Sequence, residues 1–134
     1  MRIEFTSKVI FGFDGPNISF LGNIEDFRKL SELILDLMDP NTPATIELNK
    51  SDYLVWKGEE IKLFLISKKS SNNLALLNNN ELVFELDARY WERIFRYFVL
   101  MSWYKRTYYL NAYENCLNDF DLKQDCNFIC SSEF

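Results

Sequence analysis

Hydrophobic and polar residues alternate with a period of two at the start of the chain. Ile3, Phe5 and Val9 fall on one side of residues 2–9, and charged or polar residues occupy the other side. This pattern predicts a strand with one buried face. Turn-forming residues follow at 14–17, and residues 18–21 then predict a second strand that pairs with the first as a hairpin.

Two longer segments show the spacing of amphipathic helices. The first covers about residues 23–38, begins at the N-cap residue Asn23 and ends before Pro40. The second covers about residues 88–104 and follows Asp87, which can cap its first turn. The buried stripes are predicted to consist of Ile24, Phe27, Leu30, Ile34 and Leu37 in the first helix, and of Trp91, Ile94, Phe95, Phe98 and Met101 in the second.

Short apolar runs between the helices predict strands at residues 44–48, 53–56, 61–66, 74–77 and 82–86. Residues 78–80 read as the turn of a final hairpin. Beyond residue 104, Tyr108 to Tyr113 are predicted to extend the helix after a bend, and Leu117 to Leu122 to form a short third helix. Residues 127–134 are predicted to fray.

The order of these elements predicts an α+β fold. We expect one domain over residues 1–134, with a mostly antiparallel sheet of about five to seven strands and both helices on one face. The core is expected over about residues 2–110. A partly helical, acidic C-terminal extension follows over about residues 111–134.

The absence of histidine narrows the possible chemistry more than any other feature of the composition. It excludes a Ser-His-Asp triad, a Cys-His dyad and a metal site with histidine ligands. The four glycines form neither a GxGxxG motif nor a phosphate-binding loop. Cys116, Cys126 and Cys130 are interpreted as reduced, small buried residues. The sequence therefore predicts no cofactor and no metal.

The charge is acidic overall and unevenly distributed. The net charge is −5, which disfavours direct nucleic-acid binding because phosphates require a basic face. Residues 112–134 carry five acids and one lysine, whereas residues 88–111 carry five bases and one glutamate. One interpretation is an acidic tail that folds back onto the basic helix. The other is an acidic surface that binds a basic partner.

Three groups of residues are candidates for function. The acids of the second interpretation are Glu114, Asp119, Asp121 and Asp125 in the tail, with Asp14, Glu59 and Glu60 in turns. The adjacent pair Glu59 and Glu60 is also the candidate for carboxylate-dependent hydrolysis, although acids in polar turns are ordinarily just solvated. Trp103 with Tyr104, Tyr108, Tyr109 and Tyr113 is interpreted as rim or interface packing, with base stacking as the alternative.

Glu4 and Lys8 interrupt any apolar segment of a signal peptide, and the longest apolar run is too short to cross a bilayer. The expectations are a soluble cytoplasmic protein that does not bind membranes. Free in solution it is expected to be a monomer or a weak dimer.

The stretch ISFLGNIEDFRKLSELI (residues 18–34), with the strands and helix that follow to residue 104, resembles immunity proteins of bacterial polymorphic toxin and contact-dependent growth inhibition systems. Gly22, Phe27, Leu30 and Ile34 occupy the positions of that pattern. The resemblance implies a protein that is not an enzyme and that binds and neutralises a cognate toxin, often a nuclease, by covering its basic active-site face. The seven acids above would then pair with lysine or arginine side chains of the toxin.

Two other classes of function remain open. A structural or adaptor subunit of a larger cytoplasmic complex predicts an exposed apolar patch. A small carboxylate-dependent hydrolase predicts an apolar cleft that holds a carboxyl group with a raised pKa.

Overall fold

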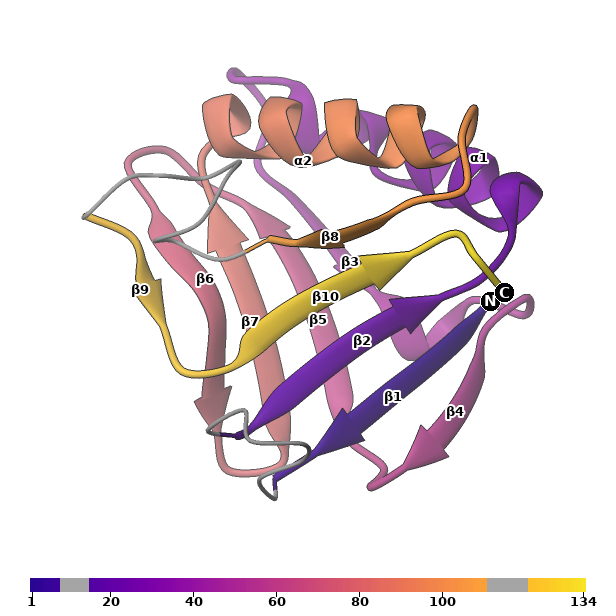
Figure 1. The fold of residues 1–134 in the computed structure, drawn as a ribbon. Coiled ribbons are helices and arrows are strands. Elements are labelled where there is room, and N and C mark those ends of the chain that lie inside the picture. Colours follow the sequence, from indigo (N-terminus) through magenta and orange to yellow (C-terminus); the bar gives the residue numbers. More distant parts are fainter. Residues whose placement is uncertain (8–14, 111–120) are drawn as a thin grey trace.

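The computed structural model describes residues 1–7, 15–110 and 121–134. These residues form two helices and two five-stranded sheets, which confirms the predicted α+β class (Figure 1). Short 3-10 turns at Leu35–Met38 (η1) and Leu48–Lys50 (η2) connect the larger elements. The predictions for residues 8–14 and 111–120 lie outside the described residues.

The first sheet has the strand order β4-β1-β2-β10-β8. The predicted N-terminal hairpin is confirmed, because β1 and β2 pair antiparallel, with Ile3 opposite Phe20. The strands are β4 (Val55–Gly58), β1 (Arg2–Thr6), β2 (Asn17–Leu21), β10 (Asn127–Ser131) and β8 (Thr107–Tyr109).

The second sheet has the strand order β3-β5-β7-β6-β9. The predicted hairpin of β6 and β7 is confirmed, and β5 lies between two neighbours, as a central strand should. The strands are β3 (Ala44–Glu47), β5 (Lys62–Ser67), β7 (Glu81–Leu86), β6 (Asn72–Asn78) and β9 (Lys123–Gln124).

The prediction of a single, mostly antiparallel sheet is wrong in its details. Each sheet mixes parallel and antiparallel pairs: β5 pairs parallel with β7, and β1 pairs parallel with β4. β6 lies between β5 and β7 in the sequence. In the sheet it pairs with β7 on the side away from β5. The chain therefore makes a parallel neighbour by means of a hairpin, without a helical crossover.

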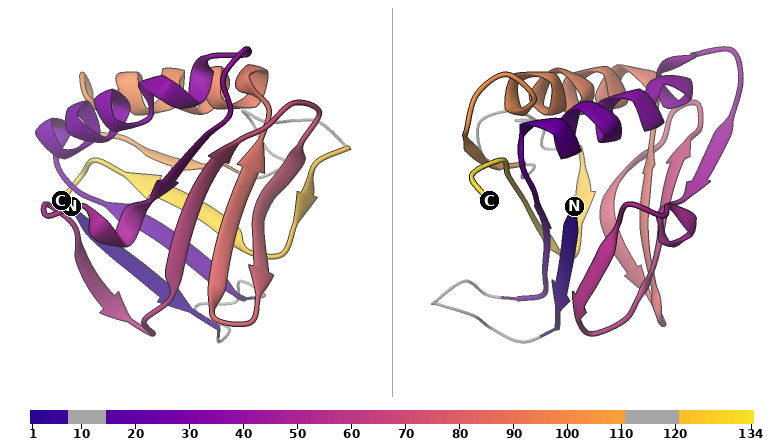
Figure 2. Two further views of the ribbon diagram at one scale, coloured as in Figure 1. Left: turned by 180° about the vertical axis from the view of Figure 1, so that it is seen from behind. Right: turned by 90° about the vertical axis from the view of Figure 1, so that its right-hand side faces the viewer.

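The helices α1 (Ile24–Leu33) and α2 (Ala88–Met101) lie side by side, as Figure 2 shows. Both helices were predicted to pack on one face of the sheet, and they do lie on the same side of the molecule. They cover the end at which the two sheets diverge, however, rather than the face of one sheet. The predicted N-caps are present: Asn23 and Asp26 form a reciprocal capping box, and the Asp87 carboxylate accepts hydrogen bonds from the N–H groups of Arg89 and Tyr90.

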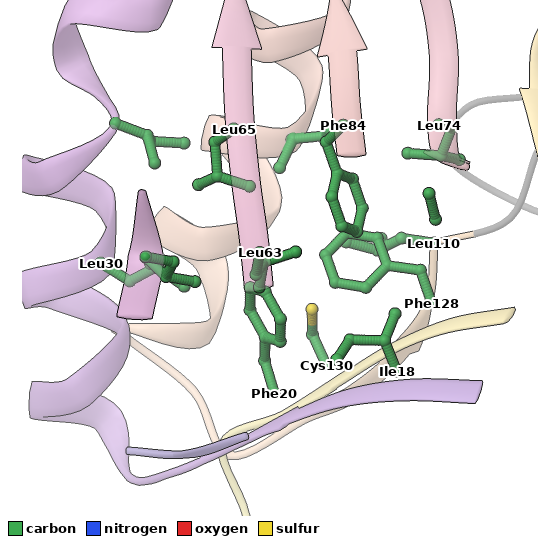
Figure 3. Close-up of a cluster of buried hydrophobic side chains, with 14 of the residues drawn as sticks. Ile18, Phe20, Leu30, Leu63, Leu65, Leu74, Phe84, Leu110, Phe128 and Cys130 are labelled. Atoms are coloured by element: carbon green, nitrogen blue, oxygen red, sulfur yellow. The ribbon is translucent and has the colours of Figure 1, made fainter. Parts of the chain in front are cut away.

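The prediction of a helical tail with a frayed end is wrong over residues 121–134. Asn127–Ser131 is a strand between β2 and β8, and residues 107–109 are strand β8 rather than an extension of α2. The physical reason is burial: Phe128 and Cys130 alternate with more exposed residues and point into the core (Figure 3).

Five phenylalanines connect all the layers of the core. Ring contacts run from Phe84 on β7 to Phe128 on β10, then to Phe20 on β2, to Phe98 on α2 and to Phe27 on α1, with ring centroids 5.0 to 6.5 Å apart. All five are buried. This continuous apolar core holds α2 in place and so fixes which of its faces is exposed.

Candidate interaction surface

The exposed face of α2 combines positive charge with apolar side chains. We call this the basic–aromatic surface. It consists of exposed residues on α2 and on the segment that follows the helix: Arg89, Arg93, Arg96 and Leu100, then Trp103, Tyr104, Lys105 and Arg106. The first five follow one another at spacings of four, three, four and three residues, which places them along one line of a helix and its final turn.

The opposite face of α2 is anchored in the core. Tyr90, Trp91, Ile94, Phe98 and Met101 are buried. The indole N–H of Trp91 also donates a hydrogen bond of 2.9 Å to the carbonyl oxygen of Ile66 on β5. The helix cannot rotate about its axis without losing these contacts, so the basic–aromatic surface has a fixed direction.

Carboxylates neutralise only part of the charge on this surface. Arg89 pairs with Asp87 at 3.3 Å and Arg96 pairs with Glu92 at 2.7 Å. Within the described residues, Arg93, Lys105 and Arg106 have no carboxylate at ion-pair distance. Among the described residues, these three cations are therefore without an ion pair.

Aromatic rings hold several of the guanidinium groups. The guanidinium carbons of Arg89 and Arg93 lie 4.6 and 5.8 Å from the ring centre of Tyr90, and that of Arg106 lies 5.6 Å from the ring centre of Tyr104. Cation–π contacts of this kind contribute about 0.5–1 kcal/mol at exposed positions. They limit the freedom of these long side chains and leave their N–H groups at the periphery.

A hollow of about 580 Å³ adjoins the N-terminal end of the surface. Arg89 belongs to both features. The hollow is also lined by Pro40 and Pro43 from the segment before β3 and by Lys68 and Lys69 from the turn after β5. Asp39 and Asp87 line it as well, so the hollow adds a mixed charged rim and a partly apolar lining next to the helix.

The predicted acidic residues do not come together. Glu59 and Glu60 follow β4, an edge strand of the first sheet, whereas Asp121 and Asp125 flank β9, an edge strand of the second sheet. Figure 1 shows these two strands on opposite sides of the molecule. Asp14, Glu114 and Asp119 lie outside the described residues. The four described carboxylates therefore form no single surface.

The carboxylates of Asp125 and Glu59 accept hydrogen bonds within the protein. The Asp125 carboxylate accepts a hydrogen bond of 3.0 Å from the N–H of Leu77 on β6. The Glu59 carboxylate accepts one of 2.7 Å from the Ser7 hydroxyl. Asp121 is exposed, and Glu60 lines a polar hollow of about 570 Å³ together with Glu81. The adjacent acids Glu59 and Glu60 thus have different surroundings.

The tyrosine cluster is divided between surface and interior. Trp103 and Tyr104 are exposed, whereas Tyr108 on β8 packs edge-on against Tyr97 of α2 with ring centres 4.9 Å apart. Tyr109 is half-buried, and Tyr113 lies outside the described residues. Only the first two aromatic residues join the basic–aromatic surface.

Cys126 and Cys130 are buried, in agreement with their interpretation as core residues. Burial, with a smaller effect of the Asp125 charge, raises the pKa of the Cys126 thiol to about 12. The thiol is therefore protonated at neutral pH. Among the described residues, no group of three or more Cys, Asp or Glu side chains is arranged to hold a metal ion.

The sequence argument identified the net positive charge of residues 88–111 but not the line that its side chains form. The signal was present: Arg89, Arg93, Arg96, Leu100 and Trp103 repeat at helical spacing on the side opposite the buried stripe. An exposed Trp at the end of such a line departs from the usual burial of large aromatic residues.

These features define an α+β protein with a basic–aromatic surface on one helix. Within the part of the chain that the structure describes, no helix has the length and apolar character needed to span a membrane. Comparison with protein-family models, with curated proteins and with solved structures gives no significant match.

Proposed function

We propose that this protein acts by binding another protein, and that it is an immunity protein that neutralises a cognate bacterial toxin domain. The observation that carries the proposal is the exposed side of α2. Trp103 is 72% exposed and Tyr104 is 54% exposed, and arginines lie beside them. Trp, Tyr and Arg are the residue types that dominate the binding energy of protein–protein interfaces.

The likeness of residues 18–104 to immunity proteins supports the choice of partner. Such a protein works by occupying a surface that the toxin needs for its activity, so it requires an interface and no catalytic group. A stable interface of this kind buries about 1,200–2,000 Å² in total. The basic–aromatic surface with the adjoining hollow offers a continuous area from which such an interface can be built.

Co-expression tests the proposal. Where the gene immediately upstream encodes a toxin-like C-terminal domain, that domain is expressed alone and together with this protein, while growth and complex formation are followed. We expect the toxin domain to arrest growth alone, and co-expression to restore growth and give a one-to-one complex. Arrest that persists in the presence of correctly folded protein, with no complex, contradicts the proposal.

An adaptor subunit of a larger cytoplasmic complex is the second candidate function. The same exposed apolar side chains, Leu100, Trp103 and Tyr104, favour it, because an adaptor also needs a docking surface. The two candidates differ in the growth assay: an adaptor associates with its complex but gives no protection against the toxin domain.

A further inference from the structure

We propose that the basic–aromatic surface is the contact surface for the toxin domain, and that it binds an acidic segment of that protein with an apolar side chain at the Trp103 end. The inference rests on the proposed function and specifies the chemistry of the partner. The partner's contact region is acidic, which is opposite in charge to the basic face that the predicted carboxylate interface requires.

The shape of the surface fits an elongated segment. Arg89, Arg93, Arg96 and Leu100 lie along about 16 Å of α2, given the helical rise of 1.5 Å per residue, and Trp103 follows in the turn after the helix. An acidic helix or extended segment of a partner can follow this line, with its carboxylates opposite the arginines. The apolar positions stand together at one end, so the segment has a defined direction.

The distribution of charge selects an acidic occupant. Residues 88–110 carry five bases and one acid, whereas the rest of the chain carries ten bases and nineteen acids. Net positive charge is thus confined to α2 and the segment after it, in a protein that is acidic elsewhere. An acidic segment is attracted to this helix and repelled elsewhere, which favours one docking position over all others.

The arginines are positioned for carboxylates. Arg89 and Arg93 both contact the ring of Tyr90, which is itself buried and fixed. A guanidinium group held against a ring keeps N–H groups free at its edge, and these can pair with a carboxylate through two parallel hydrogen bonds. Because the side chains are already restrained, less conformational entropy is lost on binding.

The charge pattern favours a protein segment over nucleic acid. A nucleic-acid strand presents a phosphate at every nucleotide and is repelled by the excess of acids over the rest of the molecule. Asp87 and Glu92 also lie among the arginines and pair with two of them. A protein segment can place its carboxylates only opposite the remaining cations, which a phosphate backbone cannot do.

The apolar end supplies the anchor. Leu100, Trp103 and Tyr104 are 42%, 72% and 54% exposed. Burying such side chains against a partner removes apolar area from water, and interface energy concentrates at residues of this type. We therefore assign an apolar partner side chain to this end and carboxylates to the arginine end.

The test compares charge-reversal variants in the same complex. Arg93→Glu with Lys105→Glu, and separately Trp103→Ala, are measured for binding to the upstream toxin domain by calorimetry at two salt concentrations. Lys57→Glu is the matched control, because Lys57 is an exposed lysine on β4, on another side of the molecule. All four positions are exposed, and circular dichroism verifies that each variant is folded.

We expect each variant of the surface to weaken binding at least tenfold, the double variant to reduce its salt dependence, and Lys57→Glu to bind like the wild type. Unchanged binding by the surface variants overturns the inference and leaves the proposed function standing. Weakening by Glu60→Gln with Asp121→Asn instead identifies an acidic interface and likewise overturns it. If the wild-type protein gives neither a complex nor growth protection, the proposed function is contradicted, and so is the assignment of the toxin domain as the partner of this surface.

Two further measurements distinguish other occupants. Binding of a 20-nucleotide oligo-dT that the double variant abolishes identifies a nucleic-acid surface and overturns the inference. Analytical ultracentrifugation tests for a second copy of the chain. A wild-type dimer that Trp103→Ala dissociates identifies that copy as the occupant and overturns the inference.

Discussion

Ala75 adopts a backbone conformation that is rare for any residue with a side chain. Its φ is 55° and its side chain is fully buried, at the register shift between Asn73 and Leu76 of β6. Its carbonyl oxygen accepts hydrogen bonds of 3.2 Å from the N–H groups of both Asp125 and Cys126. This contact joins β6 to the corner at which the chain passes from β9 to β10.

Asp125 is part of the same corner, so its replacement is expected to affect stability. Asp125→Ala removes the acceptor for the Leu77 N–H and should cost about 0.5–1.5 kcal/mol of unfolding free energy. Asp125→Asn removes the charge but keeps an oxygen acceptor. Urea denaturation of both variants separates the two roles, because equal losses would show that the charge rather than the hydrogen bond matters.

The register shift at Ala75, a bulge in β6, gives a second prediction for a single residue. A β-branched residue at positive φ is strained, so Ala75→Val should lower the unfolding free energy by about 1–3 kcal/mol, with a further cost from overpacking. Ala75→Gly relieves the backbone and loses only one buried methyl group. Chemical denaturation should therefore rank glycine above valine, and the reverse order would contradict this account of the bulge.

The buried Cys126 thiol predicts a pH dependence. Its pKa rises from 9.0 to about 12, so the unfolded chain loses this proton at lower pH than the folded protein. The contribution to stability is present below pH 9 and is lost as the pH rises toward 12. Denaturation curves between pH 8 and pH 11 should show a shallower decline for Cys126→Ala than for the wild type. Parallel declines of the two proteins would contradict the raised pKa of the Cys126 thiol.

At the scale of elements, both helices begin at their caps, and α2 ends where its packing against the core ends. α2 starts at Asp87, whose carboxylate accepts from backbone N–H groups at 3.0 and 3.4 Å. It ends at Met101 rather than at Tyr104, because Trp103 and Tyr104 have no core to pack against and remain exposed. The cap thus fixes the start of the basic–aromatic surface, and the end of the core fixes its aromatic end.

The cap is testable by a pair of substitutions. Asp87→Ala should cost about 1 kcal/mol, because the first N–H groups of α2 lose their acceptor. Asp87→Asn keeps a good N-cap residue and should cost much less. Thermal unfolding followed by circular dichroism gives both values, and a large loss in the asparagine variant would assign the effect to the ion pair with Arg89 instead.

At the scale of the whole molecule, residues distant in sequence meet in one core. Phe128 packs between Phe84 of the second sheet and Phe20 of the first, so a residue near the end of the chain connects both sheets. β10, to which it belongs, pairs with β2 on one side and β8 on the other. The C-terminal strand is therefore a central component of the fold.

Two phenylalanines near the C-terminus should respond differently to truncation. Phe128→Ala is expected to cost about 3–5 kcal/mol, as for other large buried aromatic residues. Phe134, which is 64% exposed and contacts the guanidinium of Arg2, should lose no more than about 0.5 kcal/mol when replaced by alanine. Similar losses at the two positions, measured by urea denaturation, would contradict the central placement of β10.

Local pattern and composition determined much of this protein. The caps Asn23 and Asp87, most of the two buried stripes and the two hairpins follow from interactions between residues close in sequence and could be predicted. Ile24 and Phe95, however, are only partly buried, and the buried Tyr90 was missing from the predicted stripe. Tertiary structure decided the rest. The alternation around Phe128 says that a face is buried but not which strands lie beside it, and the neighbours are β2, about 110 residues earlier in the chain, and β8. Tertiary structure also decided which charged residues lie together on the surface. The acids of one turn and one tail were separated onto opposite edges, and Asp125 was taken into a corner of the fold. The arginines of α2 were left together on one face, because the core had fixed how that helix lies.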